Sequence, residues 1–477
     1  MKTEINETHA LRDVTEFIES LDEQESLFEP QTEITIARAP GRLDVMGGIA
    51  DYSGSLVLEL PIAEATLVAL QKDDTRQLRI VSVLGNETLS LEMPLSDLER
   101  DGEPIEYADA QQYFKSDRTR HWAAYVAGVF LVLSRERGVR FDRGACLLIS
   151  SRVPEGKGVS SSAALEVATM SAVAAAFDIN IGAREVALLC QRVENLVVGA
   201  PCGVMDQMTA ACGVANHLLS LICQPAELQG SIKLPNDLAV WGLDSGVRHS
   251  IGAGDYGSVR AGTFMGYRII AELAGFNVKL SDDYVVVDDP RWNGYLANLS
   301  PSEYEEKFAR DLPEWLLGDE FISRYGGTTD RVTQIDRERQ YAVRAPAEHA
   351  IYESLRVKKF AELLDRQKDR TTLGDKMTMG ELMYASHQSY SSCGLGSHGT
   401  DLLVELVKTQ GVDRGLFGAK ITGGGSGGTV AVLGSSEAEP AVLDVSHRYA
   451  AMTGHEPYIF RGSSPGSAAF GTIVVRK

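Results

Sequence analysis

The segment from residue 154 to residue 177 constrains the fold more than any other part of the sequence. A loop of small residues, Pro-Glu-Gly-Lys-Gly-Val-Ser-Ser-Ser, runs directly into an alanine-rich stretch of helical character over residues 162–177, in which Glu166 is the only charge. A helix that is apolar on all sides has to be nearly surrounded by protein. The segment therefore predicts a layered domain with this helix in its interior.

The loop before this helix also has the properties of a phosphate-binding site. Free backbone N–H groups and the positive end of the helix dipole converge there, one serine hydroxyl can bind Mg²⁺, and Lys157 adds a positive charge. A helix N-cap explains one serine, but not three in a row after Gly-Lys-Gly. The residues expected at the phosphates are Gly156, Lys157, Gly158, Val159, Ser160, Ser161, Ser162 and Ala163.

A second glycine-rich segment covers residues 418–430. Gly423, Gly425 and Gly428 match the pattern G-x-G-x-x-G, but the segment runs into a predicted strand, whereas a dinucleotide-binding loop has to open a helix. The H-R-D and D-F-G motifs of protein kinases are absent from the sequence. The glycine density favours a backbone that closely approaches a ligand, with a simple hairpin bend as the alternative.

Charged residues gather in two further segments. Arg42, Asp44 and Asp51 are expected in a glycine-punctuated loop between two strands, where they either face a shared cleft or form turns. Glu194 is placed on a helix, and Asp206 follows a Pro-Cys-Gly turn that can aim a carboxylate inward. Solvated surface acids are the alternative for this second pair.

Composition excludes several classes of function. The chain has 477 residues and a formal net charge of −20, which opposes binding to nucleic acid. No apolar run reaches the length of a membrane span, and the first 30 residues are acidic and polar, so we expect a cytoplasmic protein with no membrane partner. The six cysteines include no C-x-x-C pair and are expected to be reduced thiols. Cys202 lies close in sequence to the candidate residue Asp206, but a small residue that fills a tight turn is the simpler explanation for it.

The pattern of elements predicts an α+β protein. We expect an accessory acidic helix within residues 1–30, a first domain over 31–235 and a second over 236–477, with a break at a Pro-Asn pair near 235. An antiparallel sheet should begin near residue 33, and the stretch 282–344 is either a lid or padding of the second domain. Further helices are expected at 121–135, 259–274, 351–366 and 379–390, and strands at 145–150, 239–244, 428–433 and 458–461.

The four segments, in this order, resemble the GHMP sugar-kinase family from about residue 33 onward. Residues 40–44 with 51–54 look like the galactokinase signature, residues 158–164 like the family's phosphate loop, and residues 420–428 like its third motif. Residues 201–206 resemble the galactokinase segment that holds the catalytic aspartate. The resemblance implies an N-terminal domain like ribosomal protein S5 domain 2, a C-terminal ferredoxin-like α/β sandwich, and an active site in the cleft between them.

One departure from the galactokinase pattern bears on the substrate. Galactokinases carry Glu-His-Thr before the aspartate of the signature, and the first two side chains face C6 of the sugar, whereas this chain has Gly48, Ile49 and Ala50 before Asp51. L-arabinopyranose is the galactose ring without its CH₂OH group. Residues 41–58 and 153–163 are also similar to the kinase domains of L-arabinokinases, so we expect phosphorylation of L-arabinose at its anomeric hydroxyl.

The resemblance implies a role for each site residue. The expected substrates are ATP and L-arabinose, the products ADP and β-L-arabinose 1-phosphate, and the expected metal is Mg²⁺. Asp206 is the expected base and Arg42 its partner, with Ser162 and Glu194 on Mg²⁺, Trp122 near adenine, and Gly48, Ile49, Asp51, Cys202, Gly203 and Tyr256 at the sugar. A galactokinase and an inactive sugar and ATP sensor remain as alternatives.

Overall fold

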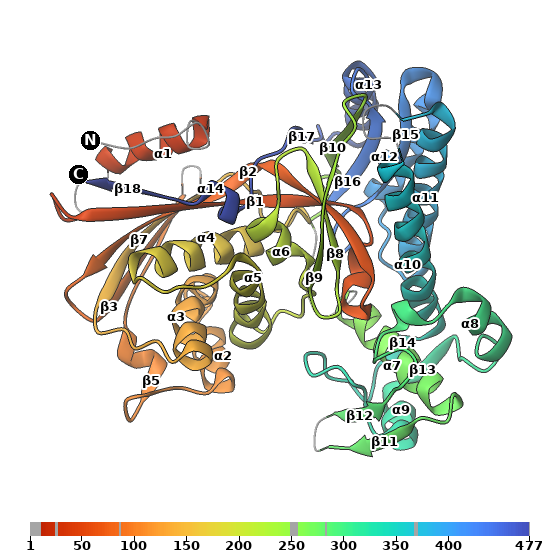
Figure 1. Ribbon diagram of the computed structural model, residues 1–477, viewed down its shortest axis with the longest axis horizontal. Helices are drawn as coiled ribbons and strands as arrows, with labels where there is room; N and C mark the ends of the chain where they lie inside the picture. Colours follow the sequence, from red (N-terminus) through yellow and green to blue (C-terminus); the bar gives the residue numbers. More distant parts are fainter. Residues whose placement is uncertain are drawn as a thin grey trace.

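The computed structural model describes residues 11–23, 27–84, 87–248, 256–281, 284–366 and 371–476. The chain forms two main sheets, each covered by helices, and a third region of helices and short strands (Figure 1). The predicted α+β class is therefore confirmed. Within the described residues, no helix combines the length and the apolar character needed to cross a lipid bilayer.

The first sheet is built on two unusually long strands, β1 and β2. Its order is β18-β1-β2-β7-β3-β4, with β8 paired to β2 and β9 to β8, and every pairing is antiparallel except that of β3 with β7. The strands are β1 (Glu33–Met46), β2 (Leu56–Asp73), β3 (Gln77–Leu84), β4 (Glu87–Pro94), β7 (Gly144–Ser151), β8 (His217–Ile222), β9 (Glu227–Lys233) and β18 (Thr472–Arg476). Because β18 ends the chain, the C-terminal residues return to the first sheet.

Helices cover both faces of this sheet. Along β7, Leu147 and Ile149 pack with α3 and α4, while Cys146 and Leu148 pack with α1 on the other face, as the two-residue period of a strand requires. The helices are α1 (Arg12–Glu23), α2 (Tyr107–Lys115), α3 (Ala124–Arg137), α4 (Ser161–Ala176), α5 (Ala183–Arg192) and α6 (Met205–Cys212). Part of the predicted accessory helix, residues 8–10 and 24–26, lies outside the described residues.

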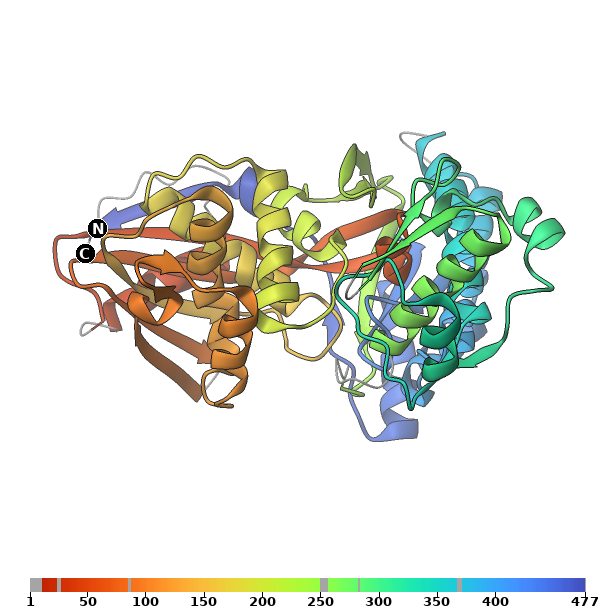
Figure 2. The ribbon, with the colours of Figure 1, turned by 90° about the horizontal axis from the view of Figure 1, so that it is seen from below.

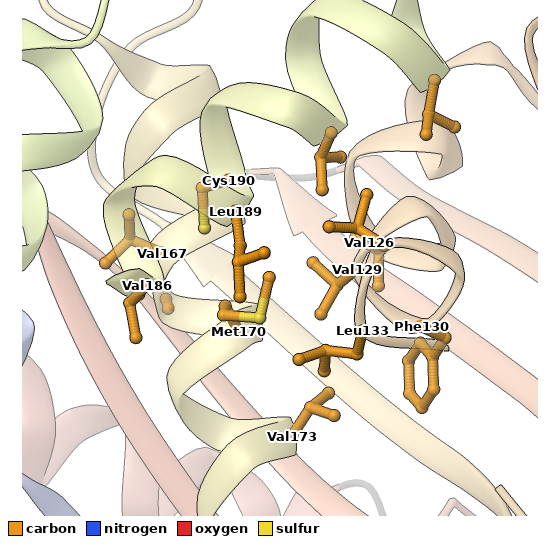
Figure 3. Close-up of a cluster of buried hydrophobic side chains, with 14 of the residues drawn as sticks. Val126, Val129, Phe130, Leu133, Val167, Met170, Val173, Val186, Leu189 and Cys190 are labelled. Atoms are coloured by element: carbon orange, nitrogen blue, oxygen red, sulfur yellow. The ribbon is translucent and has the colours of Figure 1, made fainter. Parts of the chain in front are cut away.

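The predicted interior helix is confirmed as α4. Figure 3 shows Val167, Met170 and Val173 of α4 pointing into a cluster of apolar side chains from α3 and α5. The only charged residue of the helix, Glu166, is fully buried. The first turn of α4 is thereby fixed against the sheet, and the loop that precedes it is held with it.

The second sheet has four antiparallel strands in the order β15-β16-β10-β17. Its strands are β10 (Leu238–Asp244), β15 (Leu416–Ile421), β16 (Thr429–Ser435) and β17 (Ile459–Phe460), and its helices are α10 (Arg344–Asp365), α11 (Leu373–Ser392), α12 (His398–Gln410) and α13 (Glu439–Thr453). Seen from below, β1 and β2 run from the first sheet toward this half of the molecule (Figure 2). There, Leu43 and Leu58 share a core with α10 and α11.

Residues 284–344 pack into a third region beside the second sheet, and residues 282–283 of the predicted stretch lie outside the described residues. Trp292, Phe308 and Phe321 form its core together with side chains of α7 and α10. Its elements are α7 (Tyr256–Leu273), β11 (Asn277–Leu280), β12 (Val285–Asp288), α8 (Pro301–Lys307), β13 (Trp315–Leu317), α9 (Gly318–Tyr325) and β14 (Gln340–Ala342). The predicted domain boundary near residue 235 stays a prediction.

One expectation about local structure is wrong. Arg42 and Asp44 were expected in a loop, but they lie within β1, which continues to Met46. The pairing of β1 with β2 shifts register between Pro40 and Arg42 and again between Asp44 and Met46. These irregularities accommodate the proline and glycine that suggested a loop, because a bulge admits residues that regular pairing does not.

Candidate active site

A single cavity brings most of the predicted site residues together. It encloses about 730 Å³, part of which is open to solvent. The residues that line it are Arg42, Ile49, Asp51, Gly156, Gly158, Ser160, Ser161, Ser162, Glu194, Ala200, Pro201, Cys202, Gly203, Met205, Asp206, Tyr256 and Gly424. They come from β1, the 3₁₀ turn η2 (Gly48–Ser53), the loop before α4 and the first turn of α4, the π-helical turn η5 (Val193–Val198), the loop that follows it, α6, α7 and the loop between β15 and β16.

Arg42 and Asp206 form an ion pair in this cavity. The Nε and Nη2 atoms of Arg42 lie 2.9 and 2.8 Å from Oδ1 of Asp206, and Nη1 donates to the carbonyl of Gly158 at 2.7 Å. Arg42 is 3% exposed and the Asp206 side chain 22%. The guanidinium is therefore fixed on two sides, while the carboxylate still reaches the cavity.

A second carboxyl group, that of Glu59, lies behind Arg42. Its Oε2 is 3.3 Å from Nε of Arg42, it is fully buried, and neither of its oxygens has a hydrogen bond within the described part of the chain. Burial, with Asp44 nearby, raises the pKa of Glu59 well above its ordinary value. Burial would lower the pKa of Arg42, but Asp206 and Glu59 outweigh it and hold that pKa above the ordinary value.

Glu194 lies in the same cavity, close to the serine loop. Its carboxyl accepts hydrogen bonds from Nε2 of Gln207 at 2.6 Å and from the hydroxyl of Ser162, and Gln207 also donates to Glu166 at 3.2 Å. Burial and the neighbouring Asp206 raise the pKa of Glu194 to about 7. A buried carboxyl group whose pKa is raised beside a second carboxylate suits a hard cation, which stabilises its ionised form.

These donors fit Mg²⁺, although they do not form a complete protein cage. The described residues contain no group of three or more His, Cys, Asp or Glu side chains placed to hold a metal ion. Mg²⁺ usually takes one or two protein oxygens and completes its shell with water and substrate phosphates. Ser162 and Glu194 supply such oxygens.

The loop before α4 is held in an unusual backbone conformation. Ser160 has a positive φ of 62°, and its buried hydroxyl has no hydrogen-bond partner among the residues described. Helix α4 begins at Ser161, so its free N–H groups lie at the cavity. An unpaired buried hydroxyl beside a helix N-terminus fits an anionic oxygen atom.

The second glycine-rich segment packs against this loop. A Cβ atom on Gly423 would lie 2.8 Å from the carbonyl oxygen of Gly158, and one on Gly428 would lie 2.8 Å from that of Lys157. Gly424 lines the cavity itself. The glycines therefore let the backbone of residues 423–428 contact the backbone of the loop before α4. The same glycine-rich segment also reaches the cavity. The predicted strand after it is confirmed as β16.

Asp51 lies next to Gly203. The backbone N–H of Tyr52 donates to Oδ1 of Asp51 at 2.6 Å, and a Cβ atom on Gly203 would lie only 1.5 Å from Oδ2. Burial, reinforced by Asp206, raises the pKa of Asp51 to about 7, although Arg260 opposes the shift. This carboxyl group therefore changes charge near neutral pH.

Cys202 contributes to the site through its backbone and through its thiol, which hydrogen-bonds Glu194 and Gln207. Its carbonyl accepts a hydrogen bond from Nη1 of Arg260 at 3.0 Å, and its N–H donates to Asn195 at 2.8 Å. Burial raises the pKa of the thiol well above its ordinary value. The thiol is thus protonated, and all six cysteines are free, as expected.

Five predicted residues do not line the cavity. Nζ of Lys157 lies 2.7 Å from Asp244 of β10, and Trp122 packs partly buried against the core formed by the first sheet with α3 and α4. Val159 and Ala163 are buried, although the carbonyl of Val159 accepts the N–H of Arg42 at 3.1 Å. The fifth is Gly48, directly before Ile49. The roles of these residues stay predictions.

Sequence reasoning missed three residues that surround the site. Tyr390 of α11 accepts the backbone N–H of Ile49 at 2.8 Å. Lys420 is fully buried and forms an ion pair with Asp44. Both Lys420 and Asp44 stand inside segments recognised from the sequence, but Tyr390 lies in a helix with no motif, so no sequence signal pointed to it.

Arg260 of α7 is the third of these residues. It makes a bidentate ion pair with Asp330 at 2.8 and 2.9 Å, and both side chains are buried. Its guanidinium also lies over the ring of Tyr52, 5.3 Å from the ring centroid. Through Asp330 the stretch 282–344, expected to be either a lid or padding, holds the arginine that binds the carbonyl of Cys202 in the cavity wall.

Two family descriptions match parts of the chain. Residues 124–214 match the family described as "GHMP kinases N terminal domain". Residues 25–72 match the "Galactokinase galactose-binding signature". The first match contains the serine loop, Glu194 and Asp206, and the second contains Arg42 and Asp51.

Known proteins similar to this chain include L-arabinokinase from Arabidopsis thaliana, which is 48% identical over 94% of this chain and 48% of its own length. The chain thus spans about half the length of that relative. Galactokinases from Chloroflexus aurantiacus and Streptomyces coelicolor are each 30% identical over 88% of this chain, and over 89% and 90% of their own lengths.

Solved structures with the same fold include a galactokinase of Lactococcus lactis complexed with galactose. It covers 97% of this chain and 100% of its own, with a TM-score of 0.70 and 21% sequence identity. A mevalonate kinase of L. major in complex with R-mevalonate covers 92% and 99%, with a TM-score of 0.52 and 16% identity. These likenesses confirm the predicted architecture.

Proposed function

The chain belongs to the galactokinase family of GHMP kinases, and from this premise we propose that it transfers the γ-phosphoryl group of ATP to L-arabinose. The products would be ADP and β-L-arabinose 1-phosphate. The observation that carries the proposal is the Arg42–Asp206 ion pair, which stands in one cavity with the serine loop and Glu194. The similarity to L-arabinokinase supports the choice of sugar.

Asp206 is the proposed general base. It accepts the proton of the anomeric hydroxyl as that oxygen attacks the γ-phosphorus, and the bond to the leaving β–γ bridging oxygen breaks in line with the attack. Arg42 orients Asp206 through the contacts at 2.9 and 2.8 Å. The same guanidinium adds positive charge where charge builds up on the transferring group.

The loop over residues 156–161 is proposed to hold the β- and γ-phosphates with its N–H groups and hydroxyls. Ser162 and Glu194 are the proposed ligands of Mg²⁺, which when bound would neutralise phosphate charge. Ionised Glu194 is needed for this role, and Gln207 holds its carboxyl in place. Lys157 and Trp122 are proposed to contact the phosphates and the adenine, respectively.

The sugar is proposed to lie against Ile49, Asp51, Cys202, Gly203 and Tyr256. Asp51 accepts hydrogen bonds from ring hydroxyls, and Tyr256 provides a flat apolar contact. Gly48 and Ile49 offer no polar side chain to a CH₂OH group. A pocket that merely lacks partners for an extra hydroxyl discriminates by only about 10²-fold, so D-galactose should be a poor substrate that is still detected.

A sugar panel with ADP release as the readout tests this function. We expect kcat/KM for L-arabinose to exceed that for D-galactose by about 10²-fold. A preference for D-galactose would instead make the protein a galactokinase, and binding of sugar and ATP without ADP release would make it a sensor. The expected cytoplasmic location stays a prediction.

The role of Asp206 is tested with Asp206→Asn, which keeps the shape of the side chain and removes the base. We expect the rate to fall by about 10³-fold, within the range that general bases contribute. Asp413→Asn, at an exposed position far along the chain, is the matched control and should leave the rate unchanged. A rate near that of the wild type for Asp206→Asn would refute the assignment.

A further inference from the structure

The space where a side chain of residue 48 would stand is occupied by Tyr390. A Cβ atom added to Gly48 would lie 1.7 Å from the hydroxyl oxygen of Tyr390 and 2.5 Å from Oδ2 of Asp44. No pair of unbonded atoms tolerates the shorter distance. Gly48 also has a positive φ of 45°, which favours glycine. Tyr390 can therefore occupy its position only because residue 48 has no side chain.

The hydroxyl of Tyr390 joins two walls of the cavity. It accepts the backbone N–H of Ile49 at 2.8 Å and donates to the carbonyl of Gly423 at 3.0 Å. Ile49 lines the cavity, and Gly423 touches the loop at Gly158 and the guanidinium of Arg42. One phenol therefore ties the turn beside the proposed sugar position to the glycine segment beside the proposed phosphate position.

Tyr390 has little freedom to move. It is fully buried, its ring meets that of His349 edge to face with the centroids 5.1 Å apart, and Nζ of Lys420 lies 5.2 Å from its ring centroid. Ile49, Cys393 and Leu395 pack with it in one apolar cluster. A ring held on several sides keeps its hydroxyl in place.

We propose that Tyr390 is a positioning residue that sets the sugar specificity of the site. By taking the volume of residue 48 and holding the N–H of Ile49, it fixes Ile49 as a rigid apolar wall. Such a wall fits a pyranose ring that carries no hydroxymethyl group on the side facing it. The identity of the sugar in this inference rests on the proposed function, whereas the coupling of Tyr390 to Gly48 does not.

The first test separates the hydroxyl from the ring. Tyr390→Phe leaves the N–H of Ile49 without its partner, so we expect KM for L-arabinose to rise about tenfold, with kcat and KM for ATP changed by less than about threefold. Tyr384→Phe, on the same helix and outside the cavity, is the matched control and should change none of these constants. A purely structural role would lower the amount of folded enzyme without altering KM, and that result would overturn the proposal.

The second test enlarges the space behind Ile49. Tyr390→Leu removes both the hydroxyl and part of the ring, so Ile49 can retreat from the cavity. We expect the ratio of kcat/KM for D-galactose to that for L-arabinose to rise by about tenfold, the range worth one or two carbon atoms in a pocket. An unchanged ratio would overturn the role of Tyr390 in specificity.

The third test measures the coupling without any sugar. Gly48→Ala alone should lower the midpoint of thermal unfolding, because its Cβ collides with Tyr390. In the Tyr390→Leu background the same substitution should lower the midpoint by less than half as much. The backbone strain at φ of 45° is common to both backgrounds and cancels in this cycle. Equal losses in both backgrounds would overturn the geometric half of the proposal, even if the enzyme acted on another sugar.

Discussion

The proposed phosphate side and the proposed sugar side of the cavity are built in different ways. The phosphate side, residues 156–163, is one continuous segment whose backbone and hydroxyls enter a helix held in the core. The sugar side consists of Ile49, Asp51, residues 202–203 and Tyr256, which come from separate parts of the chain. Two of these, Ile49 and Cys202, are held by hydrogen bonds to Tyr390 and Arg260, respectively, which come from other parts of the chain.

The two sides therefore depend on different features of the sequence. A backbone cradle depends on local conformation, so it requires small residues at fixed spacing. A wall of side chains depends on volumes and partners that meet only after folding. Changes to the supporting residues should therefore act selectively on the sugar, whereas changes where the two glycine-containing loops touch should act on the nucleotide.

Asp330→Asn, which removes the partner of Arg260 outside the cavity, should have the largest effect on the sugar side. It removes the charge that pairs with buried Arg260, and breaking a buried ion pair costs about 3–5 kcal/mol. We expect a large fall in the midpoint of thermal unfolding, and a raised KM for L-arabinose in the enzyme that remains folded. Differential scanning fluorimetry and steady-state kinetics measure the two effects.

Asp319→Asn is the matched control for Asp330→Asn. Asp319 pairs with Arg337 in the same region, but both side chains are more than half exposed. Exposed ion pairs contribute about 0–1 kcal/mol, so the control should unfold near the wild-type temperature. Equal losses from both variants would show that the buried pair does not support the sugar side more than a surface pair does.

Gly203→Ala changes the sugar side within the cavity itself. The added Cβ would stand 1.5 Å from Oδ2 of Asp51, so the carboxyl group has to leave its place. A displacement of about 1 Å at a reacting centre costs about 10²-fold, and we expect this loss in kcat/KM for the sugar with KM for ATP unchanged. Gly182→Ala, where a Cβ meets nothing within 4 Å, is the control. An equal loss of ATP binding would contradict the separation of the two sides.

The phosphate side is also the part of the site that sequence reasoning predicted best. The serine loop and the buried helix were predicted from local pattern alone, and both are confirmed in α4 and the segment before it. Glu194 was correctly placed on a helical segment, in the turn that continues α5. Such features depend on neighbours in sequence, which a single chain displays directly.

The supports of the sugar side were not predictable in this way. Tyr390 and Asp330 reach the site only because α11 and the stretch 282–344 pack beside η2 and α7, and no local pattern encodes that packing. Pro40 and Gly41 misled the prediction because bulges let β1 continue through them. Arg42 and Asp206, 164 positions apart, were brought together only through the family resemblance.

Gly423→Ala tests the phosphate side, with a smaller expected effect. Its Cβ would stand 2.8 Å from the carbonyl oxygen of Gly158 and 2.9 Å from Nη2 of Arg42, so the two loops have to separate slightly. Overpacking of this kind costs about 1–3 kcal/mol, and we expect kcat/KM for ATP to fall about tenfold with both L-arabinose and D-galactose. A change in the ratio between the two sugars would contradict this prediction.

The pH dependence of stability should be the smallest effect, and it compares the two sides within one measurement. Asp51 on the sugar side and Glu194 near the phosphate side both have a pKa raised to about 7 by burial. Between their ordinary values near 4 and pH 7, the folded protein binds more protons than the unfolded chain, so stability falls as pH rises. The contribution is complete below about pH 4 and is lost as pH passes through about 7.

We expect the unfolding temperature of the ligand-free protein to decrease from pH 5.5 to pH 8, and Asp51→Asn to reduce that decrease because an amide does not ionise. Addition of Mg²⁺ with ATP at pH 8 should restore part of the loss by stabilising ionised Glu194, whereas L-arabinose alone should act only through Asp51. A stability that rises over this pH range in the ligand-free protein would show that the two carboxyl groups are not held as described.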